Sequence, residues 1–141
     1  MTKKDKKFMR IAEAVSKTST FRTTMQHRIV HIGAVIVKKN RIISVGKNSK
    51  KTHPIQKYYD RYLSYYNDVK FQHHIHAEIS AIVNSNEDLY GCTMYIYRCD
   101  ATEKWLKCCR PCNACYTLIK KVGIKRIVYT INNGYAEEII K

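Results

Sequence analysis

The sequence of 141 residues is long enough for one domain with a substantial hydrophobic core and too short for two, so we expect a single domain over residues 1–141. No stretch approaches the ~20 apolar residues of a membrane span, and no apolar signal segment follows the polar residues Met1 to Lys7, which favours a cytoplasmic protein. The formal net charge of +15 suits anionic partners, either free nucleotides or nucleic acid strands, although a single run of charges is at least as often a solvated surface.

Hydrophobic patterning in the first third of the chain predicts a helix followed by two strands. After a charged lead-in at Thr2 to Lys7, four apolar residues recur at the spacing of one helix face: Phe8, Ile11, Ala12 and Val15. The apolar, β-branched run from Ile29 to Val37 is too continuous for a one-sided strand and predicts a strand buried on both faces. A turn at residues 38–40 leads to a second strand, antiparallel to the first, at Arg41 to Val45.

A long segment from Lys47 to Ile75 separates these strands from the next helix. It contains Pro54 and tyrosines whose spacing fits a helix with an aromatic face, at Tyr58, Tyr59, Tyr62, Tyr65 and Tyr66. A loop of this length in a compact domain is usually functional or partly structured. The aromatic face could stack on bases, but such a face more often packs on the core or on another subunit.

The second half of the chain alternates helix and strand. In order, we expect a helix from His76, a strand at Thr93 to Tyr97, a helix at Cys112 to Val122 and a strand at Arg126 to Thr130. The two strands should be parallel, because a helix crosses between them. The tail from Tyr135 to Lys141 should form one or two helical turns. This order predicts an α/β fold, a three-layer α/β/α sandwich with a mixed sheet of four to five strands.

Two short motifs contain the side chains that suggest chemistry. A His-Ala-Glu triplet begins at His76, and a Pro-Cys-Asn-Ala-Cys run contains Cys112 and Cys115, which are three residues apart and share one face of a helix's first turn. Zinc takes nitrogen and sulfur ligands tetrahedrally, and a catalytic zinc keeps one position open for water. His76, Cys112 and Cys115 would supply three ligands, which leaves Glu78 as a catalytic carboxylate.

With both motifs in this order, the chain resembles the cytidine and deoxycytidylate deaminase superfamily. The resemblance extends from about Phe8 to Tyr129, and the runs Gly-Ala-Val-Ile-Val and Gly-Ile-Lys-Arg-Ile-Val-Tyr look most like small, viral-type deoxycytidylate (dCMP) deaminases. It implies a cytidine-deaminase-like fold and the zinc-dependent hydrolysis of dCMP to dUMP, with dCTP to dUTP as a further candidate reaction, for the supply of pyrimidine deoxynucleotides.

The resemblance also implies roles for individual residues. One zinc ion per chain would be held by His76, Cys112 and Cys115. Glu78 would take a proton from the water that attacks C4 of cytosine, pass it to the ring nitrogen and help protonate the departing amine. Because His76 and Glu78 are two residues apart, they can share a site only at the N-terminal end of their helix.

Three further residues are candidate substrate contacts. The family pattern implies that the backbone N–H of Ala77 contacts the base carbonyl and that Asn48 binds the sugar. Arg110 could reach a phosphate or could be an exposed charge. Family members are usually homo-oligomers, either hexamers or dimers, and the sequence does not choose between these states.

Other interpretations of the same residues stay open. Cys109, Cys112 and Cys115 form an overlapping motif that could hold a closed structural zinc or an iron–sulfur cluster, although His76 and Glu78 would then be unexplained. Clustered cysteines in a reducing cytosol bind metal more often than they cross-link. His53, His73 and His74 could form a second metal site, but loop histidines near an acidic group or solvent are more common.

Two other functions compete with deamination of a free nucleotide. The net charge of +15 and the tyrosines would also suit a deaminase that acts on a base within RNA or single-stranded DNA, of the tRNA-editing type. A zinc-binding module without catalytic activity is the third possibility, and the intact Glu78 argues against it.

Overall fold

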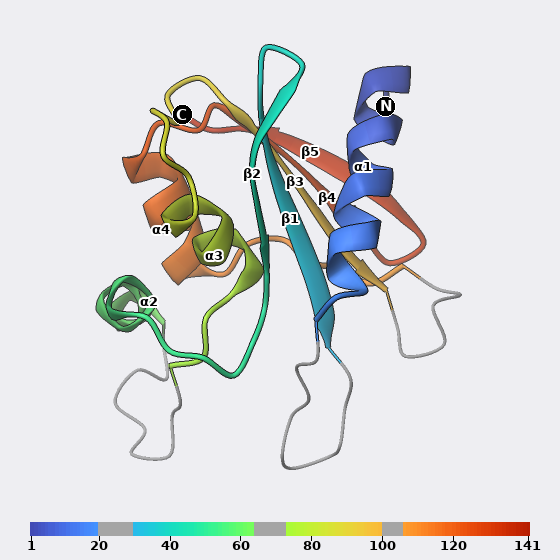
Figure 1. Ribbon diagram of the computed structural model, residues 1–141. Coiled ribbons are helices and arrows are strands. Elements are labelled where there is room, and N and C mark those ends of the chain that lie inside the picture. The colour runs from blue at the N-terminus through green and yellow to red at the C-terminus, as the bar shows by residue number, and fades with distance from the viewer. Residues whose placement is uncertain (20–29, 64–72, 100–105) are drawn as a thin grey trace.

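Five strands form one mixed sheet in the order β2-β1-β3-β4-β5 (Figure 1). The computed structural model describes residues 1–19, 30–63, 73–99 and 106–141. Its strands are β1 (His31–Lys38), β2 (Arg41–Lys47), β3 (Thr93–Cys99), β4 (Arg126–Ile131) and β5 (Gly134–Ile139). β1 and β2 are antiparallel and β3 and β4 are parallel, which confirms both predicted pairings.

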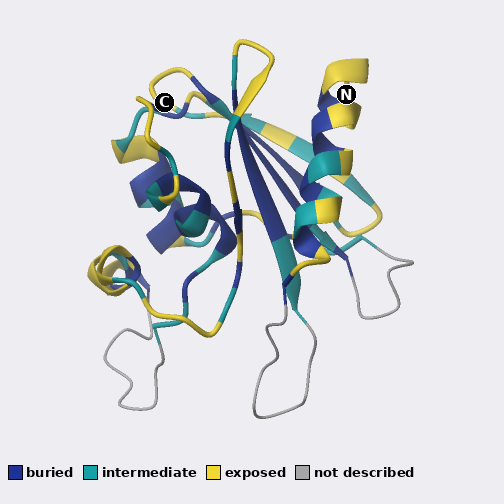
Figure 2. Cartoon of the chain, viewed as in Figure 1, coloured by how far each residue is buried: buried dark blue, intermediate teal, exposed yellow. Residues whose placement is uncertain are grey.

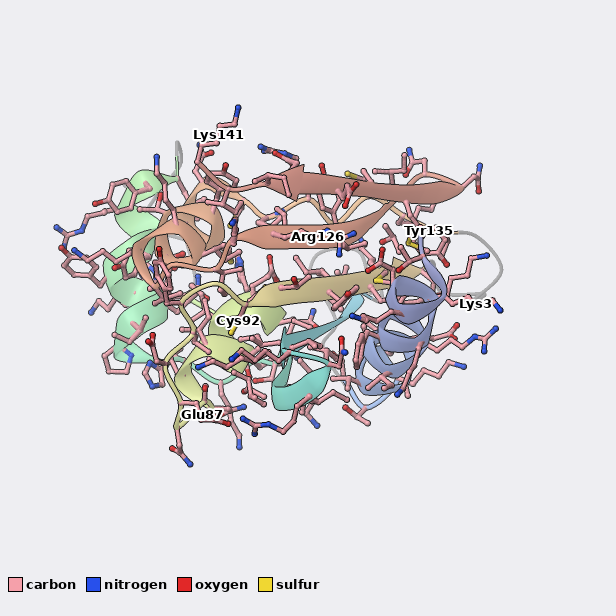
Figure 3. The ribbon with its side chains drawn as sticks, turned by 90° about the horizontal axis from the view of Figure 1, so that it is seen from above. Lys3, Glu87, Cys92, Arg126, Tyr135 and Lys141 are labelled. Atoms are coloured by element: carbon pink, nitrogen blue, oxygen red, sulfur yellow. The ribbon has the colours of Figure 1, made fainter. Side chains whose placement is uncertain are left out.

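Helices cover both faces of this sheet. They are α1 (Lys3–Ser16), α2 (Pro54–Tyr59), α3 (Ala77–Val83) and α4 (Asn113–Lys121), and a 3-10 turn, η1 (Asp60–Tyr62), follows α2. α1 lies on one face, and α3 and α4 lie on the other with α2 beside them (Figure 1). The view from above shows the same separation of α1 from the other helices (Figure 3). The predicted three-layer α/β/α class is therefore confirmed. Among the described residues, none of the helices has the length and apolar character needed to cross a membrane.

The central strand β1 is buried on both faces, as its continuous apolar run predicts (Figure 2). Successive side chains of a strand point to opposite faces. Ala34 and Ile36 accordingly join the core beneath α3 and α4, whereas Val35 and Val37 join the core beneath α1. One strand thus supplies side chains to both hydrophobic cores.

Two glycines let helices approach the sheet closely. A Cβ atom on Gly33 would lie 2.4 Å from the carbonyl oxygen of Ala12 in α1, and one on Gly46 would lie 2.2 Å from the backbone nitrogen of Ala81 in α3. Real Cβ atoms do not come this close to backbone atoms, so any larger residue would push the helix away. Gly46 in particular sets the distance between α3 and β2.

The structure corrects the predictions at the two ends of the chain. Thr2 to Lys7 is not a lead-in, because Thr2 and Asp5 form a capping box that starts α1 at Lys3. The tail from Tyr135 is not helical and instead forms β5, which pairs antiparallel with β4 along its length. A helix of seven residues has little stability of its own, whereas the open edge of β4 offers a full row of backbone hydrogen bonds.

The long segment before α3 contains α2 and η1. Tyr59 packs against the core on the α3 and α4 side, whereas Tyr58 and Tyr62 are exposed. The expectation that the aromatic face packs on the core therefore holds for Tyr59. Tyr65 and Tyr66 lie outside the described residues.

Candidate metal centre

Three metal-ligating side chains meet where α3 and α4 begin. His76 directly precedes α3, Cys112 directly precedes α4, and Cys115 lies in the first turn of α4. The Nδ1 atom of His76 is 3.3 Å from the Sγ atom of Cys115 and 3.5 Å from that of Cys112. All three ligand atoms lie within 4.8 Å of one another. The two motifs, 36 residues apart in the sequence, thus converge on one point.

The geometry of this cluster fits a zinc ion. With Zn–N bonds of about 2.0–2.1 Å and Zn–S bonds of about 2.3 Å, a tetrahedral ion places its nitrogen and sulfur ligands roughly 3.6 Å apart. The observed separations of 3.3 and 3.5 Å are close to that value. One imidazole and two thiols form a donor set typical of catalytic zinc, which has three protein ligands and one open position.

The alternative ligands do not join this cluster. The Sγ atom of Cys109 lies 3.1 Å from the Oγ1 atom of Thr130, and Cys109 is buried against the sheet. His73 forms a contact of 2.7 Å with the carboxylate of Asp60, the acidic partner expected for a loop histidine. Within the described parts of the chain, the cluster at His76 is the single group of three such ligands.

The protonation of the cluster favours metal binding at Cys112. A hydrogen bond with Cys115 lowers the pKa of Cys112 to about 4, with a further contribution from His76 and with burial acting in the opposite direction. Burial raises the pKa of Cys115 well above its ordinary value. Burial also lowers the pKa of His76, but Cys112 and Glu78 outweigh this effect and raise that pKa to about 9. The lowered pKa favours the thiolate of Cys112, the form that binds metal, whereas His76 and Cys115 would each release a proton when the ion binds.

Glu78 lies beside the cluster without belonging to it. It occupies the first turn of α3, and only 5% of its surface is exposed. Burial raises the pKa of Glu78, while the nearby His76 lowers it. A carboxylate with a raised pKa next to a metal site is suited to accept and donate protons near neutral pH.

A pocket of about 310 Å³ opens over this cluster, at the lower end of the size range of small-molecule sites. Glu78, His76 and Cys112 form its polar part. Apolar walls come from Val30, Ile32 and Ile75, and basic side chains from His74, Arg98 and Arg110. A pocket that combines an apolar wall, a proton carrier and two arginines suits a flat heterocycle attached to an anionic group.

Asn48 lines this pocket, and its amide has structural partners. Its Oδ1 atom accepts hydrogen bonds from the Ile32 backbone N–H, at 3.0 Å, and from the Ser19 hydroxyl, at 2.7 Å. Its Nδ2 atom donates to the Val30 carbonyl oxygen at 2.6 Å. The side chain therefore ties the start of β1 to the segment that follows α1, in addition to lining the pocket.

Arg110 and Ala77 differ in their access to the pocket. Arg110 is about half exposed at the pocket wall, and its guanidinium forms a bidentate ion pair with Glu138 on β5. This pairing offsets much of the charge that Arg110 could offer a phosphate. Ala77 is fully buried as the first residue of α3, between His76 and Glu78.

Sequence patterns did not reveal every residue around the site. Val30, Ile32 and Arg98 lie on or beside β1 and β3, and no motif distinguishes them from ordinary strand residues. Gln56 and Asp60 are completely buried beneath the site and were not singled out. Gln56 and Asp60 are four residues apart, a spacing at which two polar side chains can meet on a helix, and this is the sequence feature that could have indicated their contact.

A comparison with protein families gives one matching family over most of the chain. The sequence model described as "Cytidine and deoxycytidylate deaminase zinc-binding region" matches residues 2–131. The human deoxycytidylate deaminase is 32% identical over 106 residues, covering 70% of this chain and 51% of the human protein. An uncharacterized deaminase of Aliivibrio fischeri is 30% identical over 122 residues, covering 86% of this chain and 69% of that protein. The chain spans about half the length of its human and mouse relatives.

Solved structures share the same fold. A dCMP deaminase of the cyanophage S-TIM5, crystallised with dCMP and dUMP, has a TM-score of 0.57 at 22% identity, over 92% of this chain and 82% of that chain. A cytidine deaminase of Burkholderia pseudomallei has a TM-score of 0.59 at 14% identity, over 99% of this chain and 94% of that chain. At these identities the likeness supports the fold.

Proposed function

The chain belongs to the cytidine and deoxycytidylate deaminase family, and we propose that it hydrolyses dCMP to dUMP and ammonia with the help of one zinc ion. Residues 1–141 would act as a single deaminase domain. The observation that supports this proposal best is the convergence of His76, Cys112 and Cys115 beside the buried Glu78 at the base of a pocket. The relatives named deoxycytidylate deaminase support dCMP as the substrate.

The chemistry divides between the metal and the protein. Zinc bound by His76, Cys112 and Cys115 would lower the pKa of a water molecule toward about 7. Glu78 accepts the proton of the water that attacks C4 of the cytosine ring and delivers it to the ring nitrogen N3. Glu78 then helps to protonate the amino group, which leaves as ammonia while the C4 carbonyl forms. Proton transfer of this kind contributes roughly 10²–10⁴-fold to the rate.

The remaining site residues would orient the nucleotide. The apolar wall of Val30, Ile32 and Ile75 would hold the flat base and exclude water. The Ala77 backbone N–H would meet the base carbonyl, and Asn48 would meet the sugar. Arg98 and Arg110, which both line the pocket, are the candidates for the phosphate, and Arg110 would have to share its guanidinium between the phosphate and Glu138.

Further features of the enzyme are extensions of this proposal. Hydrolysis of dCTP would use the same base and sugar contacts and would differ only in the length of the phosphate chain. Supply of deoxyuridine nucleotides would be the role of the reaction. A cytoplasmic homo-oligomer, either a hexamer or a dimer, is the expected state.

Ammonia release from the purified zinc protein tests the proposal. The protein would be offered dCMP, dCTP, CMP, deoxycytidine, a cytosine-containing single strand and a transfer RNA in parallel. Turnover of dCMP with inert strands is the expected result. Turnover of a strand alone, with an affinity that falls steeply as salt rises, would instead favour the nucleic-acid deaminase suggested by the net charge of +15.

A further inference from the structure

A chain of buried hydrogen bonds leads from the α2 segment to the metal site. The Oε1 atom of Gln56 accepts a hydrogen bond of 2.9 Å from the backbone N–H of His76. The Nε2 atom of Gln56 donates to the Oδ1 atom of Asp60 at 2.7 Å. The Oδ2 atom of Asp60 in turn lies 2.7 Å from the Nδ1 atom of His73. Gln56 and Asp60 are 0% and 1% exposed, so water does not compete for these bonds.

The two ends of the Gln56 amide have fixed and different partners. An amide offers an acceptor on oxygen and donors on nitrogen. His76 presents a donor and Asp60 presents an acceptor, so a flipped amide would place donor against donor and acceptor against acceptor. Asp60 therefore determines which end of Gln56 faces His76, and the helical spacing of four residues brings the two side chains together.

The hydrogen bond to Gln56 holds the backbone of the residue that carries the imidazole ligand, His76. It directly precedes α3 in an extended conformation, with φ −84° and ψ 156°. Its own side chain makes no helix cap, because the imidazole turns toward Cys112 and Cys115. The place of the imidazole follows from the position of this backbone and two side-chain torsions. The hydrogen bond that the His76 N–H donates to Gln56 fixes the position of the backbone.

We propose that Gln56, held in orientation by Asp60, is a positioning residue for the metal ligand His76. Neither side chain belongs to the group of ligand atoms, yet both would determine where the imidazole stands. This inference rests on the metal site of the proposed function. Hydrogen-bond partners behind metal ligands typically change metal affinity by about 10–100-fold when they are removed.

The variant Gln56→Met tests the role of the amide, because methionine has nearly the same length and no strong hydrogen-bonding group. We expect its zinc affinity, measured by competition with a chelator, to fall by about 10–100-fold. The visible spectrum of the cobalt-substituted protein should change as well, since it reports the ligand geometry. Ser44→Ala is the matched control, because the Ser44 hydroxyl donates to the Ala81 carbonyl oxygen farther along α3. It should lower the melting temperature and leave zinc affinity and the cobalt spectrum unchanged.

Exchanging the carboxylate and the amide between positions 56 and 60 should restore zinc affinity. In Gln56→Glu at pH 8, two carboxylates face each other and the affinity should fall. In the double variant Gln56→Glu with Asp60→Asn, the carboxylate now at position 56 can accept from the His76 N–H and from the amide now at position 60, whose oxygen can accept from His73. All three hydrogen bonds are restored, and zinc affinity should return to within about threefold of the wild type.

These measurements test the proposal through metal binding and require no substrate. A folded Gln56→Met protein with wild-type zinc affinity and an unchanged cobalt spectrum would overturn it. If Gln56→Met does not fold, the charge exchange decides: a double variant no tighter than Gln56→Glu would overturn the proposal, and recovery would support it. Because zinc affinity is the readout, a protein that binds zinc but does not deaminate dCMP would contradict the proposed function alone.

Discussion

The guanidinium of Arg126 donates to both carboxylate oxygens of Asp5, with two hydrogen bonds of 2.9 Å that join β4 to α1 across 121 residues of sequence. The Asp5 side chain is almost completely buried and also accepts a hydrogen bond of 2.7 Å from the Tyr95 hydroxyl. Figure 3 labels Arg126 on the sheet beside α1. This pair holds the helix of one layer to the strand beneath it.

Replacement of this carboxylate should destabilise the fold. In Asp5→Asn the partly exposed Arg126 guanidinium keeps Glu137 but loses its buried charged acceptor, so the free energy of unfolding should fall by about 1–3 kcal/mol. Urea denaturation measures the loss. Arg41→Gln is the control, because the Arg41–Glu87 pair is exposed and should change the denaturation midpoint negligibly. An Asp5→Asn protein as stable as the wild type would show that the pair does not hold α1.

Stability should depend on pH through the same carboxyl group. The hydrogen bonds from Arg126 hold the pKa of Asp5 well below its ordinary value, although burial acts in the opposite direction. A group with a lowered folded-state pKa contributes stability above its unfolded pKa of about 3.9 and loses it as the pH falls toward the folded value. The wild type should therefore lose more unfolding free energy than Asp5→Asn between about pH 5 and pH 2. Parallel losses in the two proteins would contradict this assignment.

The catalytic role of Glu78 predicts a separation of activity from metal binding. Glu78→Ala removes the proton carrier and leaves the three ligand side chains in place. Turnover of dCMP should therefore fall by roughly 10²–10⁴-fold. Zinc content, measured by atomic emission, should stay at one ion per chain. Wild-type turnover by this variant would refute the proposed mechanism.

Metal retention distinguishes the ligand cysteines from their neighbours. Cys112→Ala removes the thiol whose pKa is lowered, and we expect the purified protein to lose its zinc. Cys108→Ser serves as the control, because Cys108 is an exposed free cysteine and is not in the ligand group. A full equivalent of zinc in Cys112→Ala would show that Cys112 is not a required ligand.

The sequence predicted those features that depend on local patterns. The apolar run predicts a doubly buried strand because no polar side chain lies between Ile32 and Val37. The ligand cluster could be predicted because each motif keeps its residues close in sequence. β5 could not be predicted, since Gly134–Ile139 forms a strand only beside the open edge of β4. Gln56 was missed for the same reason, because its partner His76 is 20 residues away and the bond exists only in the folded chain.

The position of the ligands means that a bound metal ion would also stabilise the fold. His76 and Cys112 begin two different helices on one face of the sheet, so a bound ion closes a loop of 36 residues between them. A bound ion would thus join the N-terminal ends of α3 and α4, whereas α1 on the opposite face carries none of the three ligands. Zinc at 100 times its dissociation constant would add about 2.7 kcal/mol to the free energy of unfolding. Chelation should therefore accelerate amide hydrogen exchange in α3 and α4 more than in α1. The supply of zinc would then help to determine the lifetime of the folded state.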